Sequence, residues 1–198
     1  MPPALTPVLE AELHSLRQAP IEAIGYGKKA YRPYEPNTGE NLIGSDDPAV
    51  TPRLLAEAQG GGDRVYRLAV VHLLGMRATA DVDPALISLL GDRDVGATAA
   101  YLLGRAGFKG YPTRARDTAA IATIVAALRQ HLDDSASFHD PFYRRTYRVQ
   151  DFMLGALVRL LGPERFKISD PRYSDIGYAL PWWSDAVRTE LLTQARTR

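Results

Sequence analysis

The chain of 198 residues is long enough for one domain, or for a short array of repeats, with a well-buried core. Hydrophobic residues make up 45% and charged residues 24%, as in an ordinary globular protein. No apolar run approaches the roughly 20 residues of a membrane span. The sequence has no cysteine, which excludes disulfides and thiolate chemistry. Because the first residues lack the basic and apolar regions of a secretory signal, we expect a cytoplasmic protein without a membrane-spanning segment.

The formal net charge of +1 is unevenly distributed along the chain. Residues 1–63 carry five basic and nine acidic side chains, and residues 64–198 carry nineteen basic and fourteen acidic ones. Of the 24 basic residues, 20 are arginines, which form bidentate contacts with carboxylates and phosphates. This asymmetry is weak support for a polyanionic partner.

The first fifty residues predict a helical cap followed by a loop. Thr6-Pro7 is a typical helix start, because Thr caps an N-terminus and Pro fits the first turn, and leucines at helical spacing follow to about Gln18. A second short helix is predicted over 21–31. Residues 32–50 are rich in Pro, Gly, Asn and Asp and predict a long loop, whose length fits a segment that covers a binding surface and regulates access to it.

The central segment repeats one sequence pattern three times. An apolar helical run ends in Leu-Leu-Gly at Gly75, Gly104 and Gly162. The glycines are 29 and then 58 residues apart, and the second interval is twice the first. A fixed period of this size is typical of stacked helical repeats, in which each helix pair buries an apolar face against its neighbours.

Each repeat is predicted as a first helix, a tight turn and a second helix, with about three repeats over 51–163. The predicted first helices cover 51–59, 83–90 and 119–132, and Asp117 or Thr118 caps the last of them. The predicted second helices cover 64–76, 94–105 and a third segment that ends at Leu161. This third segment begins at about Phe142 or Arg145, after a loop over 133–140. Residues 164–198 form the C-terminal cap, with an irregular segment over 170–181 and a final helix over 182–195 in which Trp182-Trp183 plugs the core.

The predicted second helices resemble the second helix of a HEAT-like repeat, whose consensus is roughly V-R-x-x-A-A-x-A-L-G. The matching segments are 66–75 and 95–104, and the consensus arginine is present only as Arg67. The resemblance is good over 51–107, fair over 117–163 and absent at both ends. It implies an all-α fold, a short right-handed α-α superhelix with atypical helical caps, that serves mostly as a binding scaffold.

In such an array the second helices line the concave side, and polar residues that point into its groove are candidates for binding. The predicted binding residues on this face are His72, Met76, Tyr101, Arg105 and Arg159. The small and apolar floor expected of a protein-binding groove is formed by Leu68, Ala69, Ala97 and Ala156. As the alternative, His72 and Tyr101 are ordinary surface or interface residues, and the two arginines stabilise the C-terminal ends of their helices.

A second candidate site lies in a cluster of arginines and aromatic residues before the third Leu-Leu-Gly. Arginine interleaved with tyrosine suits phosphate contact together with base stacking. The candidate phosphate-binding residues are Arg144, Arg145, Tyr147, Arg148 and Asp151. As the alternative, the cluster is a polar helix start in which Arg148 and Asp151 pair one turn apart. A nucleic-acid-binding protein would also turn Arg114 and Arg116 toward the same face as these residues.

The sequence contains no GxGxxG, GxSxG or P-loop motif and no metal-ligating spacing of its four histidines. We therefore expect no cofactor, no metal site and no catalytic residue. HEAT-like alkylpurine DNA glycosylases place an aspartate and aromatic residues on the concave surface. The cluster here that suggests such a site is Asp151 with Tyr147 and Arg148, although the motif of that family is not matched.

Together these patterns predict a non-catalytic scaffold that recognises a protein partner on its concave face. The alternative is a nucleic-acid-binding HEAT-like protein, in its most specific form a DNA-repair glycosylase. The two alternatives predict different surfaces: a groove of small and apolar residues for a protein partner, and a convergence of arginines with salt-dependent affinity for a nucleic acid.

Overall fold

The computed structural model describes residues 3–18, 39–107, 111–140, 145–170 and 183–197. Apart from one short hairpin, the regular elements in these segments are helical, so the predicted all-α class is confirmed. The helices are α1 (Pro7–Gln18), α2 (Glu40–Gly44), α3 (Val50–Gln59), α4 (Arg64–Gly75), α5 (Val82–Ser88), α6 (Gly96–Arg105), α7 (Thr118–Arg129), α8 (Val149–Leu161) and α9 (Asp185–Thr197), with a 3-10 turn, η2 (Pro163–Arg165). The hairpin consists of β1 (Ser137–Asp140) and β2 (Arg145–Arg148).

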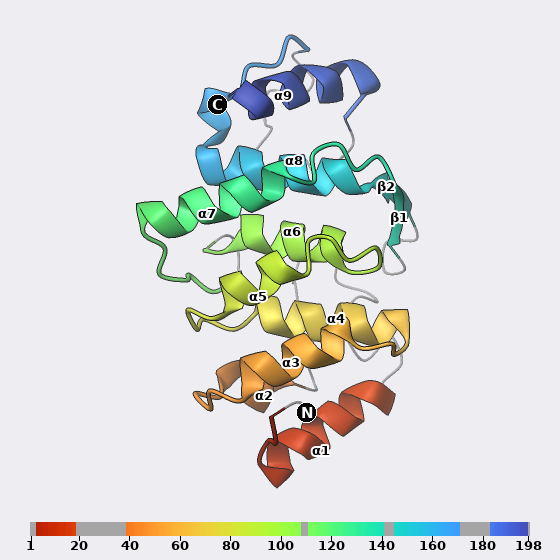
Figure 1. Ribbon diagram of the computed structural model, residues 1–198, viewed down its shortest axis with the longest axis vertical. Helices are drawn as coiled ribbons and strands as arrows, with labels where there is room; N and C mark the ends of the chain where they lie inside the picture. The colour runs from red at the N-terminus through yellow and green to blue at the C-terminus, as the bar shows by residue number, and fades with distance from the viewer. Residues whose placement is uncertain (1–2, 19–38, 108–110, 141–144, 171–182, 198) are drawn as a thin grey trace.

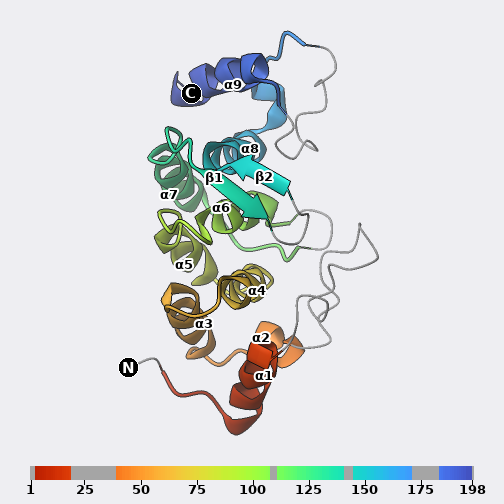
Figure 2. The same ribbon diagram turned by 90° about the vertical axis from the view of Figure 1, so that its right-hand side faces the viewer.

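The helices stack in chain order along the long axis of the molecule, from α1 at one end to α9 at the other (Figure 1). They form three successive contacting pairs, α3 with α4, α5 with α6 and α7 with α8. Seen from the side, α3, α5 and α7 form one layer, and α4, α6 and α8 form the other (Figure 2). Because α4 contacts α6 and α6 contacts α8, the second helices form a continuous row.

Several helix starts follow from the chemistry of the local sequence. α1 begins at Pro7, as predicted. The predicted cap Asp117 begins α7, because its Oδ1 accepts the Ala120 N–H group at 2.7 Å. Asp63 caps α4 in the same way. α5 begins at Val82, one residue earlier than expected.

The Leu-Leu-Gly pattern marks the places where second helices pack against each other. A Cβ added at Gly75 would lie 2.6 Å from Leu102 Cδ2, and one added at Gly104 would lie 2.7 Å from the Ala156 Cα. Carbon atoms do not tolerate such distances. At Gly104 the neighbouring atom belongs to the backbone, so glycine is required for the close approach of α6 and α8, whereas at Gly75 the Leu102 side chain would have to move. Gly162 has a different role, because it ends α8 with a φ of 95°, in the left-handed region that favours glycine.

The predicted loop over 32–50 contains a helix, α2, in the part that the structure describes. The Glu12 carboxylate holds the N-terminus of this helix by accepting the N–H groups of Gly39 and Leu42 at 2.9 and 2.8 Å. At the other end, the buried Arg77 donates to carbonyl groups of the last turn. The loop prediction is wrong over α2, because both groups that satisfy the helix ends are remote in the sequence.

Before α8 the chain forms a hairpin instead of the predicted loop and helix start. Strands β1 and β2 are antiparallel, and Ser137 pairs with Arg148. The alternating residue types of β2 include Thr and Tyr, which favour a strand. α8 therefore begins at Val149, whose N–H group donates to a carbonyl of the segment before β1 at 2.9 Å. Of the two predicted helix starts, Phe142 lies outside the described residues and Arg145 lies in β2.

The C-terminal end of the stack is covered by α9, which packs against α8. This helix begins at Asp185 and not at the predicted Trp182. Trp183 is 4% exposed, as expected of a residue that plugs the core. Trp182 lies outside the described residues, as do the predicted helix over 21–31 and most of the segment over 170–181.

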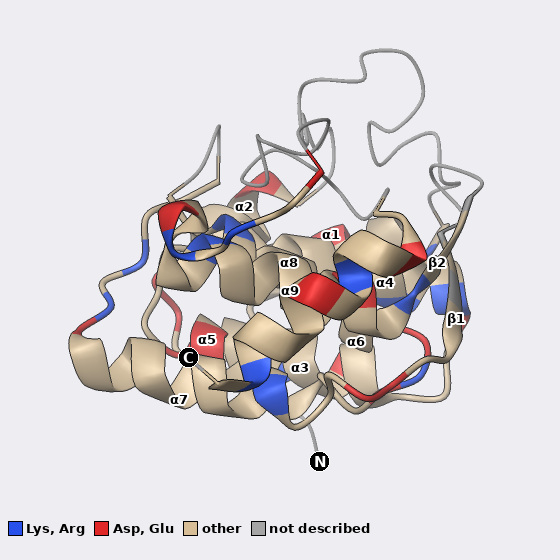
Figure 3. Cartoon of the chain, turned by 90° about the horizontal axis from the view of Figure 1, so that it is seen from above, with Lys and Arg blue, Asp and Glu red and all other residues tan. Residues whose placement is uncertain are grey.

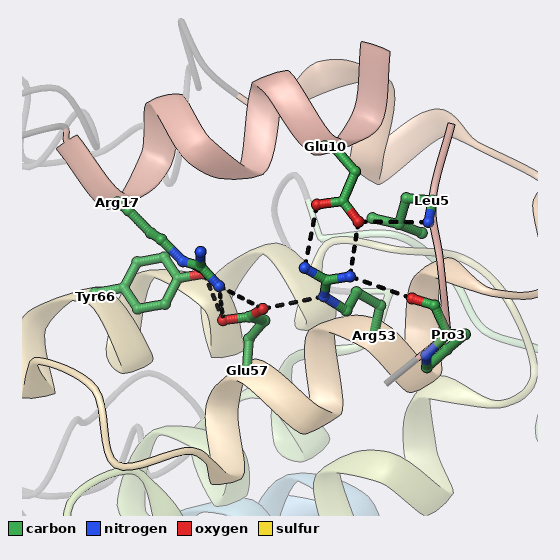
Figure 4. Close-up of polar contacts among 7 residues, drawn as sticks. All are labelled: Pro3, Leu5, Glu10, Arg17, Arg53, Glu57 and Tyr66. Carbon is green, nitrogen blue, oxygen red and sulfur yellow. Dashed lines mark hydrogen bonds and ion pairs between the residues drawn. The ribbon is translucent and has the colours of Figure 1, made fainter. Parts of the chain in front are cut away.

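At the other end, charged side chains attach α1 to the first helix pair (Figure 4). Arg53 of α3 bonds the Glu10 carboxylate of α1 at 2.7 Å, and Arg17 of α1 bonds Glu57 of α3 at 2.6 Å. Tyr66 of α4 donates to Glu57 at 3.1 Å. Burial alone would raise the pKa of Glu57, but hydrogen bonds from Arg17, Arg53 and Tyr66 outweigh it and hold the pKa below its usual value. The Glu57 carboxylate thus joins three helices.

Candidate binding site on the second helices

Three of the five residues predicted on the second-helix face lie together. Tyr101 and Arg105 are one helical turn apart on α6, and Arg159 comes from α8. The guanidinium carbon of Arg105 lies over the Tyr101 ring at 4.9 Å from its centroid, and that of Arg159 lies at 5.9 Å. Both distances fall within the range of cation–π interactions. We call these three residues the Tyr101 cluster.

A second tyrosine, which the sequence analysis did not single out, lies at the edge of the Tyr101 cluster. Tyr111 is 8% exposed, and its ring meets the Tyr101 ring edge to face, with centroids 6.2 Å apart and planes at 79°. It comes from the link between α6 and α7. The sequence feature that could have identified Tyr111 is the presence of an aromatic residue in a link rich in Gly and basic residues.

Close packing of α6 and α8 fixes the relative positions of these side chains. Gly104, which precedes Arg105, lies against the backbone of Ala156, which is three residues before Arg159. Backbones in direct contact leave little freedom for one helix to shift along the other. The Tyr101 cluster is therefore built on rigid elements, as a preorganised binding site requires.

The Tyr101 cluster concentrates positive charge in a half-buried position. Burial, and next the neighbouring charge of Arg105, lower the pKa of Arg159 to about 10. Arginine keeps its charge at neutral pH, so two cations share one aromatic ring.

The other two predicted residues of this face belong to the end of α4. His72 is 5% exposed, and burial lowers its pKa to about 4, so the imidazole is neutral at pH 7. The expectation that His72 lines an open groove is wrong, because its side chain is buried. α4 is packed against five helices, α1, α2, α3, α5 and α6. Met76 is half-buried at the C-cap of α4.

The floor expected of a protein-binding groove lies in the core instead. Each of its predicted residues is at most 1% exposed: Leu68, Ala69, Ala97 and Ala156. This part of the prediction is wrong, because small side chains at these positions serve the close packing of the helices. The half-buried Tyr101 cluster remains the candidate contact on the second-helix face.

The predicted phosphate-binding cluster is described only in part. Arg144 lies outside the described residues, and for Arg145 the structure describes only the backbone, in β2. Tyr147 packs edge to face on an aromatic ring of α8, with centroids 5.4 Å apart. Arg148 is exposed, and its Nη2 lies 3.3 Å from the Asp185 carboxylate. These contacts join the hairpin to α8 and α9, and phosphate contact stays a prediction.

Asp151 is buried in an ion pair with Arg188. Its side chain is 2% exposed, and its Oδ2 accepts the Arg188 Nη2–H group at 3.0 Å. Arg188 also donates to the Trp183 carbonyl at 3.2 Å. The expected pair of Arg148 with Asp151 is wrong, because Arg148 pairs with Asp185. The Asp151 carboxylate therefore joins α8 to α9.

Two arginines that a nucleic-acid-binding face would require are instead bonded within the fold. Arg114 and Arg116 contact Asp83 at 2.8 and 2.6 Å. Arg114 also donates to the carbonyls of Gly75 and Leu102, in the last turns of α4 and α6, at 2.9 and 3.1 Å. Burial would raise the pKa of Asp83, but the two arginines outweigh it and hold the pKa below its usual value. The nucleic-acid alternative requires these two arginines on a binding face, but they fasten successive helix pairs.

Acidic and basic residues are interspersed around the described part of the stack (Figure 3). The same segments hold no group of three or more His, Asp or Glu side chains placed to bind a metal ion. None of their helices has the length and apolar character needed to cross a membrane. Comparisons of the chain with models of protein families, with curated proteins and with solved structures find no match.

Proposed function

We propose that this protein is a non-catalytic binding scaffold, a short right-handed α-α superhelix of HEAT-like repeats that recognises a protein partner on the face of its second helices. The observation that carries the proposal is the Tyr101 cluster, in which one ring and two arginines meet on adjacent second helices. Tyrosine and arginine are enriched among the residues that dominate the energetics of protein interfaces.

The contacts of Arg67 support the HEAT-like interpretation. Arg67 matches the consensus arginine and lies on α4, in the first helix pair. Its side chain donates to the Ala58 carbonyl of α3 at 2.6 Å and to the Asp94 carboxylate before α6 at 3.0 Å, and it also bonds Asp92. One arginine thus joins both helices of its own pair to the turn of the next pair, which suits repeats that are stabilised by their nearest neighbours.

A nucleic-acid-binding role has less support. Such a role needs several arginines along one face, because a nucleic-acid backbone is bound through many phosphate contacts. Arg114 and Arg116 are instead bonded to Asp83. An alkylpurine glycosylase would further need an aspartate in contact with the lesion, whereas Asp151 is buried beside Arg188.

Photo-crosslinking tests the scaffold proposal. A p-azidophenylalanine side chain is introduced at Tyr101, and in a control at Ala126, which is exposed on α7 in the layer of first helices. We expect one discrete partner to crosslink at Tyr101 and not at Ala126, and the purified partner to form a defined complex with the unmodified chain. Equal crosslinking at both positions, or a partner that forms no complex when purified, would contradict the proposal.

A further inference from the structure

We infer that α1 can exchange between two copies of this chain, so that the α1 of each copy binds the other copy. The surface that receives it is the part of α2, α3 and α4 that α1 covers, which we call the α1 site. This inference goes beyond the proposed function, because it concerns the end of the stack and not the second-helix face. It rests on the matched contacts of α1 and on the length of the link that follows this helix.

The apolar side of α1 is buried against the stack. Leu9, Leu13 and Leu16 recur at helical spacing and are at most 6% exposed. α1 packs against α2 and α4 at one end of the molecule (Figure 1). An empty α1 site would expose apolar surface to water, which is unfavourable. α1 is therefore stable when it is docked, and the same contacts form whether it docks on its own copy or on another.

The charged side chains of α1 make its docking specific. Glu10 and Arg17 lie two helical turns apart on α1, and they bond Arg53 and Glu57 of α3 at 2.7 and 2.6 Å (Figure 4). Each negative charge thus meets a positive one, and in the opposite register like charges would meet. Glu12 adds bonds to the N–H groups at the start of α2. The α1 of a second copy is therefore an occupant whose fit to this site is already evident.

The link after α1 is longer than docking within one copy requires. The N–H group of Gly39 donates to the Glu12 carboxylate at 2.9 Å, so the chain returns beside the middle of α1. From there the end of α1 at Gln18 is roughly 10–15 Å away. The residues between these two points, 19–38, number 20 (38 − 19 + 1), and a chain of that length can span up to roughly 65 Å. The additional length allows α1 to reach the α1 site of a second copy.

Reciprocal exchange fills both sites at once. When the α1 of each copy binds the other, the two copies are related by a two-fold axis, and neither needs a contact surface other than the one that α1 already uses. A tethered helix has an effective concentration of millimolar order at its own site, so exchange competes once the chains are similarly concentrated. Such a concentration arises where several copies bind one partner with repeated recognition motifs.

Paramagnetic relaxation enhancement tests the exchange with every native contact of the α1 site in place. Unlabelled Ser15→Cys chains carry a nitroxide at this exposed position of α1, and they are refolded from urea together with nitrogen-15-labelled wild-type chains. The natural sequence has no cysteine, so the label attaches at one position. At about 1 millimolar chain we expect a dimer in which the label broadens the amide signals of Glu57 and Tyr66 of the other copy.

The control for this measurement is a nitroxide on the layer of first helices. Ala126→Cys places it on the exposed side of α7, where it should leave the signals of Glu57 and Tyr66 sharp. A chain that remains monomeric at this concentration would overturn the inference. So would a dimer in which the label on α1 broadens neither signal, or broadens them no more than the label on α7.

Matched charge reversals separate exchange from dimerisation through another surface. The first variant reverses the charges of α1, with Glu10→Arg and Arg17→Glu. The second variant reverses those of α3, with Arg53→Glu and Glu57→Arg. Either variant alone has a mismatched α1 site, both within one copy and in a homodimer. In an equal mixture, exchange of α1 restores every pair, so the heterodimer should form at least about tenfold more tightly than either homodimer.

A chain that carries all four reversals is the control for the mixture. It restores the matched pairs within one copy and should fold as a monomer at micromolar concentration, as the wild type does. If this chain folds and the mixture shows no preference for the heterodimer, the inference is wrong. If this chain does not fold, the relaxation measurement decides, because it leaves the native pairs unchanged.

Discussion

Gly104 of α6 lies so close to Ala156 of α8 that a Cβ added at Gly104 would be 2.7 Å from the Ala156 Cα. Rotation of a side chain cannot relieve a contact with a backbone atom, so Gly104→Ala must push the two helices apart. We expect the free energy of unfolding to fall by about 1–3 kcal/mol in urea titrations followed by circular dichroism.

Gly61→Ala provides the control for this substitution. Gly61 lies between α3 and α4, and a Cβ added there would meet no atom within 4 Å. Its free energy of unfolding should stay within about 0.5 kcal/mol of the wild type. If both variants were equally stable, α6 and α8 would not approach each other as closely as described here.

The same substitution at two arginines should have different effects. Arg93→Gln removes an exposed positive charge from the link between α5 and α6, so the free energy of unfolding should stay within about 0.5 kcal/mol of the wild type. Arg114→Gln removes bonds to Asp83 and to two helix-end carbonyls and should lower it by about 3 kcal/mol. Urea unfolding compares the two variants. A loss at Arg93 as large as that at Arg114 would show that the bonds of Arg114 do not hold the helix pairs together.

The array of second helices could be predicted because its pattern reflects contacts between adjacent repeats. Gly75 and Gly104 recur at one period since each lies where a second helix meets its neighbour. The same periodicity places Tyr101 and Arg159 at equivalent positions, and equivalent positions on adjacent helices are neighbours. Their contact therefore follows from the repeat, although the repeat pattern does not include Tyr111.

Features that depend on remote segments could not be predicted from local patterns. Glu12 and Arg77 hold the two ends of α2, and His72 is buried in a stack where α4 packs against five other helices. Arg114 and Arg116 are basic residues in a link, and their local sequence is the same whether they face water or bond Asp83. Sequence periodicity detects a stripe of apolar residues, but it does not detect which polar residues find a buried partner.

His72 should make the stability of the protein fall as the solution becomes acidic. Its pKa is about 4 in the folded state, because of burial, and the ordinary pKa of histidine is 6.5. The unfolded chain thus binds a proton more readily, so stabilisation by the neutral imidazole is complete above pH 6.5 and is lost as the pH falls toward 4. We expect a loss of about 2 kcal/mol between about pH 7 and 5, measured by urea unfolding at each pH.

The control for His72 is a histidine that is exposed. His72→Gln should flatten the decline in stability over this pH range, whereas His14→Gln, on the exposed side of α1, should retain it. A decline that survives unchanged in His72→Gln would show that the buried imidazole does not cause it.

Glu12→Gln should loosen α2 without unfolding the rest of the stack. The Glu12 carboxylate accepts the N–H groups of Gly39, Asn41 and Leu42 at 2.9, 3.2 and 2.8 Å, and a neutral amide with one oxygen accepts them more weakly. We expect a loss of about 1 kcal/mol and faster hydrogen exchange at Asn41 and Leu42, measured by nuclear magnetic resonance. Glu40→Gln removes a negative charge from the first turn of the same helix and should change this exchange little. Equal acceleration in both variants would mean that charge near the helix N-terminus, and not the bonds from Glu12, holds α2 in place.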